Sequence, residues 1–222
     1  MTLLLALPTF AFDVQTNDLG QDLSWADMPI SYQIDLGDMP DALSRDEWIA
    51  TIDAAFDTWA QVEGAAVQFE RGAVSDSTGL SDSDGVNRVW FSSEFEGDVQ
   101  TGATTTLFLG SGGQPRGFDI AINTEQPWSL DGSGPDALAA LTHEVGHVLG
   151  LDHSDVADAT MYASMKPSDQ FRRELHDDDQ AGAQHLYPQI NLPPALACNQ
   201  APLGQLSLFS LLLPALAARR LR

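Results

Sequence analysis

The chain has little cysteine and few basic residues, and each shortage excludes a class of protein. Its 222 residues include a single cysteine, Cys198, so no disulfide can form within the chain. Stability therefore comes from an apolar core, for which 43% hydrophobic residues suffice, and from any bound metal. Only 10 Lys and Arg residues oppose 32 Asp and Glu residues, a formal net charge of −22. Because a nucleic-acid binder needs a basic face to neutralise phosphates, that class is excluded, and docking on anionic membranes is disfavoured.

The charge is also unevenly distributed along the chain. All 32 acidic residues lie between Asp13 and Asp179, whereas three of the ten basic residues are among the last four positions. Such an acidic domain suits an exported protein that holds hard cations, although a need for solubility explains the charge equally well.

The first residues resemble an export signal. Residues 1–11 contain a short apolar run, and Thr9 and Ala11 fit the small-residue pattern of a signal-peptidase site. The positive residues that normally precede the apolar run are missing. We interpret residues 1–11 as a truncated signal peptide that leaves Phe12 as the new N-terminus, with a merely apolar N-terminal segment as the alternative.

The C-terminal end has the composition of a linker and a tail. Residues 191–202 follow the domain and contain Cys198, and residues 203–222 combine an apolar stretch with terminal arginines. This is the positive-inside arrangement of a tail whose preceding domain was exported. It resembles bacterial sorting tails, which predicts that Cys198 is a processing or lipid-attachment point; a plain tail anchor is the alternative. We expect an exported protein, extracellular or anchored at the cell surface, that meets a membrane only through this tail.

Between the two ends, residues 12–190 show the mixed patterns of one α+β domain. Apolar residues alternate over residues 28–36 and predict a strand. Ser44 and Glu47 form a capping box that begins a helix, whose apolar residues recur at three and four positions, and Gly64 is expected to end it. Further strands are predicted at residues 66–70, 87–91, 104–109 and 117–123.

Several aspartates are candidate calcium ligands. The loop of residues 76–85 is rich in Ser, Asp and Gly, and Asp82 and Asp84 are its candidate ligands. The loop lacks the full EF-hand pattern, so a solvated turn is the favoured alternative. Asp119, Asp131 and Asp136 are candidate calcium ligands or cap residues, with no spacing rule to choose among them.

The clearest chemical signal is the run from His143 to His153. His143 and His147 are four residues apart, on one face of a predicted helix, where two imidazoles can bind one Zn²⁺. Gly150 permits a sharp turn after that helix, which would return His153 to the same metal as a third ligand. Three neutral imidazoles leave a fourth position for water, and Glu144 lies beside the first ligand, where it can serve as general base.

With this motif, the sequence resembles the metzincin metallopeptidases and, among them, the matrixins. Met161 and Tyr162 follow His153 at the offset of the matrixin Met-turn. Residues 118–123 are similar to the matrixin strand that precedes the active-site helix, and residues 175–187 are similar to its C-terminal helix. The resemblance implies a zincin-like α+β catalytic domain: a twisted mixed sheet with one antiparallel edge strand, an active-site helix and a C-terminal helix.

The resemblance also implies the roles of the site residues. One catalytic Zn²⁺ would lie on the three motif histidines, and a zinc-bound water would attack a peptide carbonyl with Glu144 as general base. Met161 would form an apolar floor under the metal. Tyr162 would wall the pocket for the residue after the scissile bond, a role for which Met165 fits the spacing less well. An extended polypeptide would pair with the edge strand at Thr104, Thr105, Thr106 and Leu107.

Two features of the family have no counterpart here. No histidine precedes His143, so a second, structural zinc site is not expected. The only cysteine, Cys198, lies behind the domain, so latency through a propeptide cysteine is not expected either.

We predict a zinc-dependent endopeptidase that acts as a monomer, with Ca²⁺ as a further candidate ion. One rival is a zinc-containing surface module that binds peptides without cleaving them, which an intact Glu144 argues against. The other is a zinc hydrolase of different amides or esters, which a long edge strand disfavours weakly.

Overall fold

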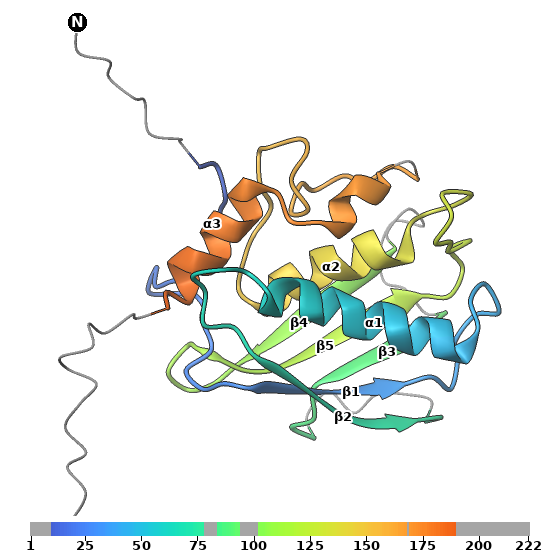
Figure 1. Cartoon of the computed structure of the whole chain (residues 1–222). Helices are drawn as coiled ribbons and strands as arrows, with labels where there is room; N and C mark the ends of the chain where they lie inside the picture. Colours follow the sequence, from blue (N-terminus) through green and yellow to red (C-terminus); the bar gives the residue numbers. More distant parts are fainter. Residues whose placement is uncertain (1–9, 78–83, 94–101, 168, 190–222) are drawn as a thin grey trace, which may run out of the picture. The chain divides into compact units, whose positions relative to one another are not determined.

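In the part of the chain that the structure describes, five strands form one mixed sheet with an antiparallel pair at its edge. The computed structural model describes residues 10–77, 84–93, 102–167 and 169–189. The strand order is β2-β1-β3-β5-β4, in which the first four strands are parallel and β4 runs antiparallel to β5. This confirms the predicted sheet and places β4 at an edge (Figure 1). The strands are β1 (Ile30–Asp35), β2 (Phe69–Ser75), β3 (Arg88–Ser92), β4 (Ala103–Leu109) and β5 (Pro115–Asn123).

Two long helices cover the same face of the sheet (Figure 1). These are α1 (Arg45–Ala60) and α2 (Ala137–Val148), followed in the chain by the short 3-10 helix η1 (Gln170–Arg173) and by α3 (Asp177–Leu186). α1 packs against α2, and the indole nitrogen of Trp59 donates a hydrogen bond of 2.7 Å to the buried carbonyl of Thr142. This bond joins α1 to α2, the helix that carries His143 and His147.

The predicted capping box begins α1. The Ser44 hydroxyl accepts the backbone N–H of Glu47, and the Glu47 carboxylate accepts the backbone N–H of Ser44 at 2.8 Å. The helix then buries the expected apolar stripe, and each of its large side chains contributes about 1.5–3 kcal/mol when fully removed from water. The buried members of the stripe are Trp48, Ile52, Ala55, Phe56 and Trp59.

Two predicted boundaries were wrong. α1 ends at Ala60 with Gln61 as its C-cap, before the predicted stop at Gly64. The strand expected at residues 66–70 is β2, which begins at Phe69 and continues to Ser75. For β2, the pairing with β1, from Ile30 opposite Phe69 to Asp35 opposite Ser75, decides the boundary that the local sequence left open.

The N-terminal segment of the domain packs against the end of α2. The backbone N–H of Gln15 donates to the carbonyl of Gly150 at 2.8 Å, and the N–H of Asp152 donates to the carbonyl of Asp13 at 3.0 Å. The buried carboxylate of Asp178 accepts the backbone N–H of Phe12 at 3.1 Å. The turn after α2 is therefore held by residues more than a hundred positions away in the chain.

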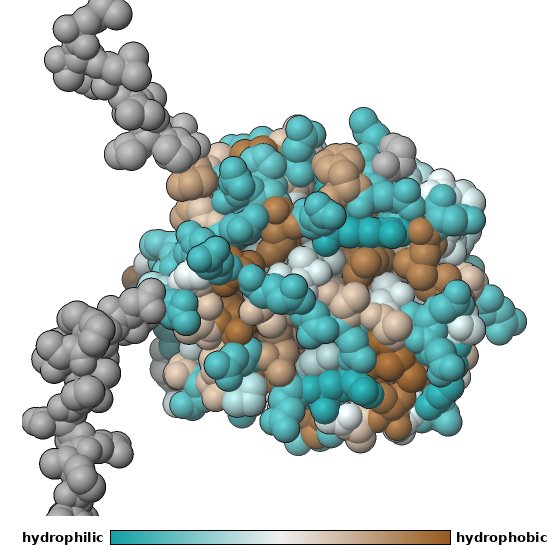
Figure 2. Space-filling model, in the orientation of Figure 1, coloured by the Kyte–Doolittle hydropathy of each residue, from teal (hydrophilic) through white to brown (hydrophobic). Residues whose placement is uncertain are grey.

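The surface seen in Figure 2 is hydrophilic over most of its area, with apolar patches between the polar residues. Within the described residues, no helix has the length and apolarity needed to cross a membrane. The predicted linker, tail and Cys198 lie outside the described residues, as do Asp82 and residues 1–9 of the predicted signal peptide at residues 1–11.

Candidate metal centre and active site

The start of α2 is fixed by specific contacts. Asp136, a candidate calcium ligand or cap residue, is the N-cap of α2 and accepts the backbone N–H of Ala139 at 2.9 Å. This fully buried carboxylate is also paired with the Arg173 guanidinium, which offsets the cost of burying its charge. From this start the helix presents His143 and His147 on one face, with their Nε2 atoms 3.1 Å apart.

The predicted turn at Gly150 brings the third histidine to the other two. Gly150 has a φ of +97°, and a Cβ at this position would lie 2.1 Å from the carbonyl oxygen of Leu23, so only glycine fits. The chain reverses there, and the His153 ring comes within 5.2 Å of the His143 ring and 5.0 Å of the His147 ring, measured between centroids. One ligand atom from each of the three histidines lies within 4.8 Å of the others.

The imidazole rings of His143 and His147 are hydrogen-bonded so that the lone pairs of their Nε2 atoms face each other. Nδ1 of His143 donates to the carbonyl of Thr160 at 2.8 Å, and Nδ1 of His147 donates to the carbonyl of Leu151 at 2.9 Å, because a carbonyl can only accept. In the neutral rings both Nε2 atoms are then unprotonated. Burial is the main cause that lowers the pKa of His143, to about 3, and burial also lowers the pKa of His153.

This donor set fits a zinc ion. Two facing lone pairs with no proton between them repel each other unless a cation lies between them. Neutral imidazole nitrogens are preferred zinc ligands, and a partner on the other ring nitrogen is the usual way in which a protein fixes their orientation. Among the described residues, the histidine triad is the only group of three or more candidate ligand residues close enough to hold a metal.

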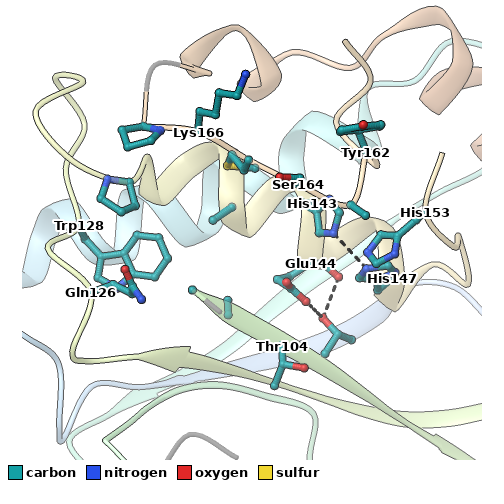
Figure 3. A pocket seen from close by; sticks show the side chains of 18 of the residues that line it. Thr104, Gln126, Trp128, His143, Glu144, His147, His153, Tyr162, Ser164 and Lys166 are labelled. Carbon is teal, nitrogen blue, oxygen red and sulfur yellow. Dashed lines mark hydrogen bonds between the residues drawn. The ribbon is translucent and has the colours of Figure 1, made fainter. Parts of the chain in front are cut away.

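Glu144 is held between the triad and the edge strand (Figure 3). The Thr105 hydroxyl, on β4, lies 2.7 Å from Oε2 of Glu144 and 3.0 Å from its carbonyl oxygen. Burial raises the pKa of Glu144, while His147 and the Thr105 hydrogen bond act in the opposite direction. The sequence placed Thr105 among the substrate contacts, and the structure gives it a contact with the general-base candidate.

Met161 packs against α2 between the two histidines of the helix. A Cβ on Gly146 would lie 2.2 Å from Sδ of Met161 and 2.8 Å from the Trp59 ring, so a larger residue there would have to displace these two side chains. Met161 is 1% exposed and contributes an apolar surface beside the triad.

The turn at Thr160 and Met161 is held by a residue that no sequence motif singled out. Asp179, at the start of α3, is buried and accepts the backbone N–H of Thr160 at 2.8 Å and that of Met161 at 2.9 Å. The carbonyl of Thr160 in turn accepts Nδ1 of His143. The three consecutive acids at 177–179 were visible, but the pattern does not say which of them faces inward.

A cavity of about 860 Å³ adjoins the triad and extends along α2. Its wall opposite the edge strand comes from residues 162–167, which include both Tyr162 and Met165. Thr104 and Thr105 line the cavity, whereas Thr106 and Leu107 do not, and Leu107 packs against the core instead. Three further residues line the cavity although no sequence motif singled them out, because the fold brings them there from distant parts of the chain: Gln15, Gln126 and Trp128.

The described calcium candidates have protein partners. The Asp84 carboxylate pairs with the Arg88 guanidinium at 2.6 Å, and the Asp119 carboxylate accepts the backbone N–H of Arg88 at 3.1 Å. Asp131 accepts the N–H of Ser133 at 3.0 Å within its own turn. The prediction of calcium remains untested.

The sequence profile of the matrixins matches residues 24–188. The chain belongs to the matrixin family. The predicted family, its fold and its zinc-binding histidine triad are therefore confirmed. Similar proteins include karilysin of Tannerella forsythia, 34% identical over 84 residues, and stromelysin-3 of Rattus norvegicus, 38% identical over 78 residues. Matrix metalloproteinase-16 of Homo sapiens is 32% identical over 150 residues.

The matched segments cover 37%, 34% and 63% of this matrixin, in the order just given. They span 17%, 15% and 24% of the length of those relatives, respectively. The likeness to these relatives thus covers only part of each protein.

Proposed function

We propose that this matrixin is a zinc-dependent endopeptidase that hydrolyses peptide bonds in extended polypeptides. The observation that carries the proposal is the position of Glu144. It is a buried carboxylate, held by Thr105 of the edge strand, next to three imidazoles that offer their lone pairs to one metal. A non-catalytic zinc module has no need of a buried carboxylate at this point, because burying it costs free energy.

Glu144 carries out both proton transfers, and Thr105 orients it. Zinc bound at the triad would supply a Lewis acid and lower the pKa of a water molecule toward neutrality. Oε2 of Glu144 accepts the Thr105 hydroxyl, so Oε1 is the oxygen left to take the proton of the attacking water. The same carboxyl group then delivers that proton to the nitrogen of the leaving amine. The Thr105 hydrogen bond keeps the carboxylate oriented through both transfers.

The substrate would bind as an additional strand. β4 lies at the edge of the sheet, and Thr104 on this strand is exposed and lines the cavity. An extended peptide can pair with such an edge through main-chain hydrogen bonds and place alternate side chains in pockets. We assign the cavity between Trp128 and Tyr162 to the side chain after the scissile bond.

We also propose that the protein works outside the cell, as a monomer. Residues 1–11 would be the leader, residues 12–190 the catalytic domain, residues 191–202 the linker with Cys198, and residues 203–222 the sorting tail. The acidic domain and the apolar, arginine-ended tail support this division. Calcium remains a candidate ion.

The test compares the full chain with Glu144→Gln, which keeps the size of the side chain and removes its basicity. Bound zinc and cleavage of a quenched-fluorescence peptide library are measured on the same samples. We expect one zinc in both proteins and cleavage only by the unaltered one, abolished by a chelator and restored by zinc. One zinc in both without cleavage by either would favour the binding module, and cleavage of esters alone would favour a different hydrolase.

A further inference from the structure

The wall of the cavity at residues 162–167 has little regular structure of its own. These residues lie between the Met-turn and η1, and they face the edge strand across the cavity (Figure 3). A loop that defines a pocket must be fixed by contacts from elsewhere, since its own backbone makes no helix or strand.

One side chain behind this wall contacts it at both Ser164 and Tyr162. Arg172, in η1, is 4% exposed. Its Nη1 donates to the carbonyl of Ser164 and its Nη2 donates to the carbonyl of Ala157, both at 2.6 Å. The guanidinium also lies 5.3 Å from the ring centroid of Tyr162, and its Nη2 lies 3.6 Å from the Asp169 carboxylate.

The shape of the guanidinium suits this position. A planar fork can donate to two carbonyls at once while its face contacts an aromatic ring, whereas an ammonium is a point charge that cannot do both in a fixed geometry. The two carbonyls are seven residues apart in the chain, so the fork fixes the span that contains Tyr162. The nearby ion pair with Asp169 compensates the buried charge.

We propose that Arg172 is a positioning residue for substrate selectivity, which holds the wall at residues 162–164 and thereby sets the width of the pocket. The proposal rests on the peptidase function proposed above and deepens it. The far side of this pocket includes Trp128, Pro135 and Ala140, so the held wall favours a large apolar side chain after the scissile bond. The catalytic groups are held by other groups: Thr105 holds Glu144, and the carbonyls of Thr160 and Leu151 hold the histidines. Arg172 meets this set through its backbone carbonyl, which accepts the Thr160 hydroxyl at 3.1 Å and which a side-chain substitution leaves in place.

This separation predicts a selective defect. Without the Arg172 guanidinium, the wall loses its fixed position and the pocket loses its defined width. Peptides with a large apolar residue after the scissile bond then lose contacts with residues 162–164. Peptides with alanine at that position make few such contacts and lose little. A pocket contact of this kind changes specificity by about tenfold or more. Because binding contacts are affected, the loss appears mainly in KM.

The experiment uses the full-length zinc protein, Arg172→Gln and the matched control Arg173→Gln. Arg173 is the neighbouring arginine and also forms an ion pair, but with Asp136 at the start of α2, away from the wall. Two peptides that differ only in leucine or alanine after the cleaved bond give kcat and KM, with zinc content and melting temperature measured in parallel. For Arg172→Gln we expect the leucine-to-alanine ratio of kcat/KM to fall about tenfold. For Arg173→Gln the ratio should stay unchanged.

Arg172→Lys keeps the positive charge and provides a second variant in case the glutamine protein does not fold. It should fold with one zinc and still lose the selectivity ratio. An equal loss for both peptides, or an unchanged ratio in folded Arg172→Lys, would overturn the proposal. Absence of cleavage by the unaltered protein would instead overturn the peptidase function, so the two failures are distinguishable.

Discussion

Replacing Asp179 by asparagine should destabilise the Met-turn and weaken zinc binding together. Its Oδ1 accepts the N–H of Met161, and its Oδ2 accepts the N–H groups of Thr160 and His176, at 2.8–2.9 Å. Asparagine offers one acceptor oxygen and one NH₂ group. Its oxygen can accept the N–H groups on one side, but its NH₂ group then faces the backbone N–H on the other side, donor against donor.

The magnitude follows from these contacts. One hydrogen bond to a charged acceptor contributes about 1.5–3 kcal/mol, and a buried N–H left without a partner costs about 1–3 kcal/mol. We therefore expect a loss of roughly 2–5 kcal/mol in the free energy of unfolding. For a domain of this size, that corresponds to a melting temperature lower by roughly 5–15 °C. Zinc affinity should fall about tenfold, because the Thr160 carbonyl that orients His143 loses its support.

The assay is thermal unfolding by circular dichroism, with and without zinc, together with a competitive zinc titration. Asp177→Asn is the matched control, because Asp177 lies in the same first turn of α3 but is exposed. Both substitutions remove one negative charge from the helix start, an effect of about 0.3–1 kcal/mol. If the two variants melt within about 2 °C of each other, the assigned support of the Met-turn by Asp179 is wrong.

Three further substitutions test other parts of the structure. Thr105→Val removes the hydroxyl that orients Glu144, and should lower kcat about tenfold in steady-state assays while zinc content stays the same. Gly146→Ala places a Cβ 2.2 Å from Sδ of Met161, and should lower stability to denaturant by about 1–3 kcal/mol although alanine is the better helix former. Glu47→Ala removes a carboxylate whose pKa is lowered by hydrogen bonds from the N-cap serine. Since the folded state favours the ionised form, this stabilisation is present above the ordinary pKa and is lost as the pH falls through the lowered one. Melting curves of Glu47→Ala and the parent should therefore differ near neutral pH and converge in acid.

The zinc motif could be predicted from the sequence because its geometry is local. His143 and His147 are four residues apart on one helix, and Gly150 is next to the turn that it permits. The capping box of α1 is local for the same reason, since Ser44 and Glu47 reach each other across a single helical turn. Where the chain's own neighbours decide a structure, spacing and residue type are sufficient.

Contacts between distant segments could not be predicted in this way. The boundaries of β2 follow from its pairing with β1, and Leu107 turned out to face the core instead of the cavity. Asp179 is the clearest case. Asp178 and Asp179 are both buried, but only Asp179 accepts the two N–H groups of the Met-turn, and three consecutive acids do not show this until α3 packs beside that turn.

The sequence by itself therefore determined which residues bind the metal and which carboxylate lies beside them. The tertiary structure alone decided how those residues are held, through Thr105 on Glu144, Asp179 on the Met-turn and Arg172 on the wall of the cavity. The physical reason is the range of the interactions. A helical turn fixes neighbours a few residues apart, whereas a hydrogen bond between remote segments forms only after the apolar core has brought them together.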